Sequence, residues 1–175
     1  MPGALLGVGV VVVALAGCTA APADDPVPPP VQAVPPAPPA ACLLDPARLA
    51  ADTGLTWTPD QTTASDTRCV YDPGPASGQP APEPADFLAV EIASAGADDA
   101  QTELDGVAGV CADGSRAPIQ ADGRGFVCRF RGGSVFAAAV RAGQLVTVSA
   151  SAVPTGTTAA RLVLALQQQL ADLGR

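Results

Sequence analysis

Five cysteines are the residues of this chain best suited to specific covalent chemistry: Cys18, Cys42, Cys69, Cys111 and Cys128. The chain has no histidine, and its nine basic residues are all arginine. Histidine is the commonest general base and transition-metal ligand, and Schiff-base catalysis needs lysine, so both kinds of site are disfavoured. No Cys-x-x-Cys spacing is present to begin a zinc site. The cysteines therefore predict disulfide bonds and covalent modification, with no cofactor.

Cys18 follows a 13-residue apolar run over residues 4–16. The run is too short to cross about 30 Å of hydrocarbon, but it is typical of a signal-peptide core. It ends in Leu15-Ala16-Gly17-Cys18, which resembles the lipobox of bacterial lipoproteins. The resemblance implies that residues 1–17 are removed and that Cys18 carries a diacylglyceryl group. Two acyl chains hold a protein stably on a membrane, so we expect an exported protein anchored at the extracytoplasmic face.

Acylation of Cys18 leaves an even number of thiols to pair. Four cysteines allow three pairings, and we favour Cys42–Cys69 with Cys111–Cys128 because each closes a short loop in a separate half of the chain. Loops of this size stabilise a fold by about 3 kcal/mol each in the chain-entropy account.

Proline dominates the segment after Cys18. Nine of the eighteen residues from Pro22 to Pro39 are proline, a composition that prefers the extended polyproline II form. The sequence thus divides into a signal peptide over 1–17, a lipidated cysteine and tether over 18–41, and one globular envelope domain over 42–175.

Helix signals occur at three places in that domain. Asp45-Pro46 predicts the start of a short helix that ends at Gly54. A second helix is expected over about 97–107. The third has Thr157 or Thr158 as its cap and one apolar stripe; the stripe comprises Ala159, Leu162, Val163, Leu166, Leu170 and Leu173.

Strand signals fill the intervals. They cover 68–72, 86–94, 125–131, 134–141 and 144–151, and the last three are joined by tight turns. In 125–131 we expect Phe126, Cys128 and Phe130 to point inward and Val127 to point outward. The predicted fold class is α+β: an antiparallel sheet with a short N-terminal helix, a middle helix and a C-terminal amphipathic helix packed on it, and two disulfides.

Arginine is concentrated between residues 116 and 141, where five arginines accompany a single acid, Asp122. If Arg129, Arg131 and Arg141 share the solvent face of the sheet, they form a positive patch suited to phosphate or carboxylate groups. The alternative is an exposed face that carries charge for solubility.

Acidic residues give two further hypotheses. Asp98, Asp99, Glu103 and Asp105 could gather around calcium, but no D-x-D-x-D-G loop is present and acids at a helix start explain them better. A hydrolase acting through carboxylates would need a facing pair, such as Glu91 with Asp86 or Asp113.

Two short motifs resemble a known group of proteins. Cys42-Leu43-Leu44 before a short helix, and Cys69-Val70-Tyr71, resemble the C-x-L-L and C-x-[WY] signatures of small actinobacterial lipoproteins classed as domains of unknown function. The second half is similar in layout to the extracytoplasmic sensor domain of a mycobacterial Ser/Thr kinase. The resemblance covers roughly residues 41–173. It implies a related fold and transfers no catalytic residue.

These observations favour a membrane-anchored envelope lipoprotein that is not an enzyme. We expect a binding or sensor-like module for an envelope protein or an anionic cell-wall or lipid ligand. The formal net charge of -8 disfavours nucleic acid as a partner. A carboxylate-based cell-wall hydrolase and a lipid carrier stay open as alternatives.

Overall fold

A computed structural model describes residues 38–75, 86–95, 100–119, 124–130 and 132–173. The described residues belong to one compact unit, Pro36–Arg175. The predicted signal peptide, Cys18 and nearly all of the predicted tether lie outside the described residues.

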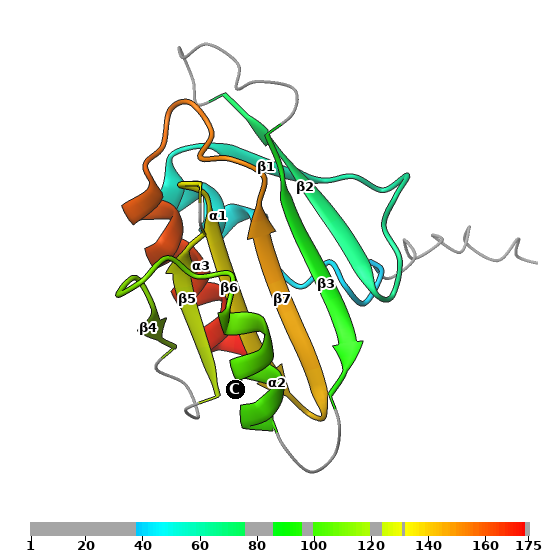
Figure 1. Ribbon diagram of the computed structural model, residues 1–175. Helices are drawn as coiled ribbons and strands as arrows, with labels where there is room; N and C mark the ends of the chain where they lie inside the picture. The colour runs from blue at the N-terminus through cyan, green and yellow to red at the C-terminus, as the bar shows by residue number, and fades with distance from the viewer. Residues whose placement is uncertain (1–37, 76–85, 96–99, 120–123, 131, 174–175) are drawn as a thin grey trace, which may run out of the picture. The chain divides into compact units, whose positions relative to one another are not determined.

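Seven strands form one antiparallel sheet in the order β1-β2-β3-β7-β6-β5-β4 (Figure 1). In chain order they are β1 Thr56–Pro59, β2 Arg68–Gly74, β3 Leu88–Ser94, β4 Ala117–Pro118, β5 Gly125–Arg129, β6 Val135–Arg141 and β7 Gln144–Ala150. Helices α1 (Pro46–Thr53) and α3 (Ala159–Leu173) lie behind the sheet in Figure 1, and α2 (Ala100–Ala108) lies in front of it. The predicted fold class is confirmed, together with its three helices.

Local capping explains where α1 begins and ends. The Asp45 carboxylate accepts hydrogen bonds from the backbone N–H groups of Ala47 at 2.8 Å and Arg48 at 3.3 Å. Gly54 ends the helix with φ at 79°, a left-handed conformation that glycine adopts without a steric penalty. The predicted start and stop are confirmed.

The main core lies between the sheet and the helices α1 and α3. Leu162, Leu166 and Leu170 of α3 are buried against it, as the apolar stripe predicts. The strand side chains that meet them alternate along each strand: Leu88, Val90, Val127, Val135, Val146 and Val148.

A smaller core lies on the other face, under α2. It contains Leu104, Cys111, Phe126, Cys128, Phe136, Ala138 and Leu145. The prediction that Val127 points outward is therefore wrong, because both faces of β5 are buried: Val127 lies in the main core, and Phe126 and Cys128 lie in the smaller one. Val127 is fully buried in the main core, while Phe130 is 38% exposed at the end of the strand.

Two disulfides join Cys42 to Cys69 and Cys111 to Cys128, which is the predicted pairing. The first ties the chain before α1 to β2, and the second ties the residues after α2 to β5. Structural disulfides persist in oxidising surroundings, so they indicate an extracytoplasmic environment.

Candidate functional site

Helix α2 is the element around which openings gather. Leu104 is its most deeply buried side chain, at 4% exposure. The helix covers part of β6 and β7, while no helix of the described residues covers the same face of β2 and β3 (Figure 1). The Cys111–Cys128 disulfide follows the helix by three residues and fixes its end to β5.

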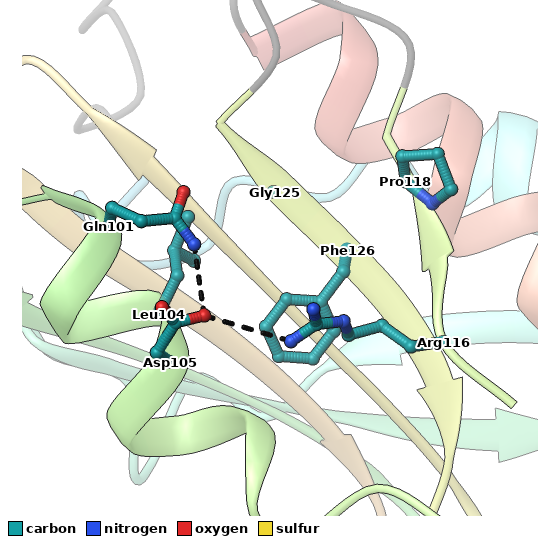
Figure 2. Close-up of a pocket in the computed structure, with 7 residues that line it drawn as sticks. All are labelled: Gln101, Leu104, Asp105, Arg116, Pro118, Gly125 and Phe126. Atoms are coloured by element: carbon teal, nitrogen blue, oxygen red, sulfur yellow. Dashed lines mark hydrogen bonds and ion pairs between the residues drawn. The ribbon is translucent and has the colours of Figure 1, made fainter. Parts of the chain in front are cut away.

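The first opening is a pocket of about 240 Å³ between α2 and the short strand β4 (Figure 2). It is lined by Gln101, Leu104, Asp105, Arg116, Pro118, Gly125 and Phe126. Typical small-molecule sites hold about 300–1,000 Å³, so this pocket suits one end group of a larger ligand.

Arg116 lies over the Phe126 ring in this pocket. Its guanidinium carbon lies 5.5 Å from the centroid of the Phe126 ring, within range of a cation–π contact. The outer edge of the guanidinium carries N–H donors in a fixed fork, a geometry that matches carboxylate and phosphate oxygens. Figure 2 shows this group reaching across the ring toward α2.

Asp105 meets Arg116 from the helix. Arg116 Nη1 lies 3.8 Å from Asp105 Oδ1, and Gln101 Nε2 donates a hydrogen bond of 2.9 Å to the same oxygen. The Arg116 and Asp105 side chains are 52% and 57% exposed. An ion pair this long and this exposed contributes little, about 0–1 kcal/mol, so a ligand anion can displace Asp105 from the arginine.

Gly125 lets the strands approach closely at the pocket floor. A Cβ at this position would lie 2.8 Å from the Ala138 carbonyl oxygen and 3.1 Å from Ala139 Cβ. Only glycine fits there without moving the backbone. The neighbouring Phe126 pairs with Pro118 across β4 and β5, which sets the ring beside Arg116.

The second opening is a groove of about 690 Å³ on the other side of α2. Val107 of α2 and Val110, just after the helix, form one wall, and Phe136 and Leu145 lie at the adjoining sheet surface. Its far rim is polar, with Arg68 directly opposite Glu91 on β2 and β3. The groove therefore joins an apolar half to a rim with one charge of each sign.

A third opening, of about 660 Å³, borders α3. It contains Arg129 and Asp113 beside Ala160, Val163 and Leu164, and Leu164 is 56% exposed.

The structure does not bring Arg129 and Arg141, two of the three arginines of the predicted patch, side by side. Arg129 lies opposite Val135 at the first residue of β6, whereas Arg141 is the last residue of that strand. Six residues of extended chain separate those two positions, roughly 20 Å. Both strand positions are on the sheet face that carries α3, and Arg131 lies outside the described residues.

The acidic pairs suggested by the sequence do not face one another. Asp86 and Glu91 are five residues apart along extended chain, roughly 16 Å, beyond the 5–9.5 Å that glycoside hydrolysis needs. Asp113 lines the opening beside α3, on the opposite face from Glu91. Asp98 and Asp99 lie outside the described residues, and Glu103 and Asp105 lie on α2. Within the described ranges, no cluster of three or more acidic or cysteine side chains is placed to hold a metal ion.

Sequence reasoning counted Arg116 in the arginine-rich segment but did not single it out. Its role depends on β4, a two-residue strand that carries no alternating pattern. Pro118, two residues after Arg116, gave no indication that this segment would form a strand and pair with Phe126. The position of Arg116 over Phe126 therefore depends on tertiary structure, which local sequence patterns do not reveal.

Comparisons with protein-family models, curated proteins and solved structures find no match for this chain. Among the described residues, no helix has the length and apolar character needed to cross a membrane.

Proposed function

We propose that this chain is a lipid-anchored, extracytoplasmic binding module that captures an anionic ligand of the cell envelope at Arg116. The observation that supports the proposal best is the pocket in which Arg116 lies over Phe126 beside α2. The pocket presents the Arg116 guanidinium, the Phe126 ring and the Gln101 amide, which are groups that can bind a ligand.

Arg116 suits this role better than the other arginines because its side chain is already positioned. A guanidinium lying over a ring has given up part of its rotational freedom before a ligand arrives, so binding orders less. Arg129 and Arg141 are exposed strand residues for which no aromatic contact is found among the described residues.

The anchor and the tether complete the proposal. Lipid on Cys18 would hold the protein at the membrane, and residues 19–37 in polyproline II form would reach up to roughly 60 Å at about 3.1 Å per residue. Ala41 is already buried in the core of the domain. The domain would then sample the envelope at that distance from the membrane. The two disulfides support an extracytoplasmic location, because disulfides persist in an oxidising compartment.

Co-sedimentation of the domain with an isolated envelope fraction tests the binding site. We expect the wild-type domain to sediment, Arg116→Gln to stay in the supernatant, and Arg129→Gln to sediment like the wild type. Loss of binding in Arg129→Gln alone would contradict the proposal and favour the patch suggested by the sequence.

Metabolic labelling with radioactive palmitate tests the anchor separately. The wild-type chain should incorporate label and partition with membranes, and Cys18→Ser should do neither. Equal labelling of both chains would overturn the lipid anchor while leaving the binding site intact.

A lipid carrier is a second candidate, favoured by the groove of about 690 Å³ beside Val107 and Val110. Each CH₂ of an acyl chain buried there would contribute about 0.8 kcal/mol. Gly106 lines the groove, and a Cβ at that position meets nothing within 4 Å. Gly106→Phe should therefore fill the groove and abolish binding of a fluorescent fatty acid, while Arg116→Gln should leave it unchanged.

A further inference from the structure

We infer that the Arg116 pocket recognises the free C-terminal carboxylate of a short peptide whose last side chain is small and apolar. This inference rests on the proposed function and names the chemistry of its ligand. It depends on four features of the pocket: its charge, its amide, its apolar surface and its size.

The charge of the pocket favours a monoanion. One arginine is accompanied by one carboxylate, Asp105, at 3.8 Å. Sites for phosphorylated groups usually gather several arginines around the doubly charged anion. Here the Asp105 carboxylate would repel the second negative charge of a phosphate, whereas a singly charged carboxylate needs only the two N–H donors of one guanidinium edge.

The amide of Gln101 adds a feature that a peptide can use. Its Nε2 donates to Asp105, and among the described residues its Oε1 accepts no hydrogen bond. In Figure 2 this oxygen points away from Asp105. A peptide ends in a carboxylate preceded by an N–H, so one ligand end can bond Arg116 and donate to Gln101 Oε1. A lone inorganic anion cannot supply that donor.

The apolar surface and the volume limit the rest of the ligand. Phe126 lies beside the guanidinium, Leu104 lines the same pocket, and both are 5% exposed or less. The small apolar surface that they leave open has room for no more than a small apolar side chain next to the carboxylate. With about 240 Å³ available, the pocket holds one terminal residue, and the remainder of the peptide continues into solvent.

Ligand-observed saturation-transfer NMR on the intact domain tests the inference with three probes of similar size. They are acetyl-alanyl-alanine, the same dipeptide with a C-terminal amide, and glycerol 3-phosphate. We expect the free acid to bind with a Kd on the order of 1 mM, typical of so few contacts. The amide and the phosphate should bind at least tenfold more weakly.

Three variants make the result specific. Arg116→Lys keeps the charge but loses the planar fork, and Arg116→Gln loses both, so each should weaken binding of the free acid at least tenfold. Arg129→Gln is the matched control and should bind like the wild type. Asp105→Asn removes the repelling carboxylate, so it should strengthen binding of both anions and strengthen that of the phosphate more.

The outcomes separate this inference from the proposed function. Preferential, Arg116-dependent binding of glycerol 3-phosphate would overturn the carboxylate assignment and leave an anion site at Arg116. Equal binding of the acid and the amide would also overturn it. Two outcomes would overturn both the carboxylate inference and the proposed function. One is anion binding that Arg116→Gln does not change. The other is a domain that binds none of the three probes and does not sediment with envelope.

Discussion

The Tyr71 hydroxyl makes two hydrogen bonds with the backbone of Leu44: it accepts from the Leu44 N–H at 3.0 Å and donates to the Leu44 carbonyl oxygen at 3.1 Å. Tyr71 is fully buried on β2, two residues from the Cys42–Cys69 disulfide. The segment that leads into α1 is thus joined to the sheet by one covalent bond and one shared hydroxyl.

Replacing Tyr71 with Phe should lower the free energy of unfolding by about 1–3 kcal/mol. The substitution keeps the ring but leaves two buried backbone groups of Leu44 without their partner. Urea denaturation of the two proteins, both with intact disulfides, measures the loss. A stability equal to the wild type would show that water or another group replaces the hydroxyl.

Tyr71 should also make the stability of the domain depend on pH in the alkaline range. Burial raises the pKa of Tyr71 to about 12, while its hydrogen bond with Leu44 acts in the opposite direction. The folded state holds the Tyr71 proton more tightly than the unfolded state does. The resulting contribution to the free energy of unfolding is therefore complete below about pH 10. It is lost as the pH rises to 12, by roughly 1.4 kcal/mol per pH unit.

The composition of the chain makes it possible to attribute this loss of stability to Tyr71. Tyr71 is the single tyrosine and the chain has no lysine, so few other side chains titrate in that range. Denaturation at pH 10, 11 and 12 should show a falling stability in the wild type and a nearly level one in Tyr71→Phe. Parallel curves for the two proteins would contradict the assignment.

Removing the Cys111–Cys128 disulfide should release α2. A nine-residue helix is marginal by itself, and the bridge holds its end to β5. We expect Cys111→Ala with Cys128→Ala to cost about 2–4 kcal/mol and to speed amide hydrogen exchange in α2. The matched variant, Cys42→Ala with Cys69→Ala, should also lose stability, but its α2 exchange should change only as global unfolding requires.

Two glycines, Gly106 in the groove beside α2 and Gly125 in the Arg116 pocket, should respond in opposite directions to alanine. Gly106→Ala places a Cβ in open space on a helix, so it should stabilise the protein by up to about 1 kcal/mol. Gly125→Ala places a Cβ 2.8 Å from the Ala138 carbonyl oxygen, so it should destabilise it by about 1–3 kcal/mol. Thermal unfolding of both variants checks the pair, and a stable Gly125→Ala protein would show that β5 and β6 can separate without cost.

Sequence patterns predicted the elements whose signals are local. The cap at Asp45, the stop at Gly54 and the stripe of α3 depend on neighbouring residues, and each lies where the pattern placed it. Loop length was enough to choose the observed cysteine pairing. The two missed strands, β1 and β4, are four and two residues long, and each contains a proline, which speaks against a strand.

The site could not be predicted in the same way because it depends on which faces of the sheet are covered. Alternation in β5 separates Phe126 from Val127 correctly, but it does not reveal that both faces of the strand are buried. The error over Val127 has this origin. Only the β4–β5 register brings Phe126 beside Arg116.

Binding of an anion by Arg116 can be observed at the side-chain N–H of this arginine. In ¹⁵N-labelled domain, the Arg116 Nε–Hε resonance should shift saturably on titration with acetyl-alanyl-alanine, while the corresponding resonances of Arg129 and Arg141 stay in place. If neither that peptide nor glycerol 3-phosphate moves the Arg116 resonance, or if another arginine moves instead, Arg116 is not the anion site.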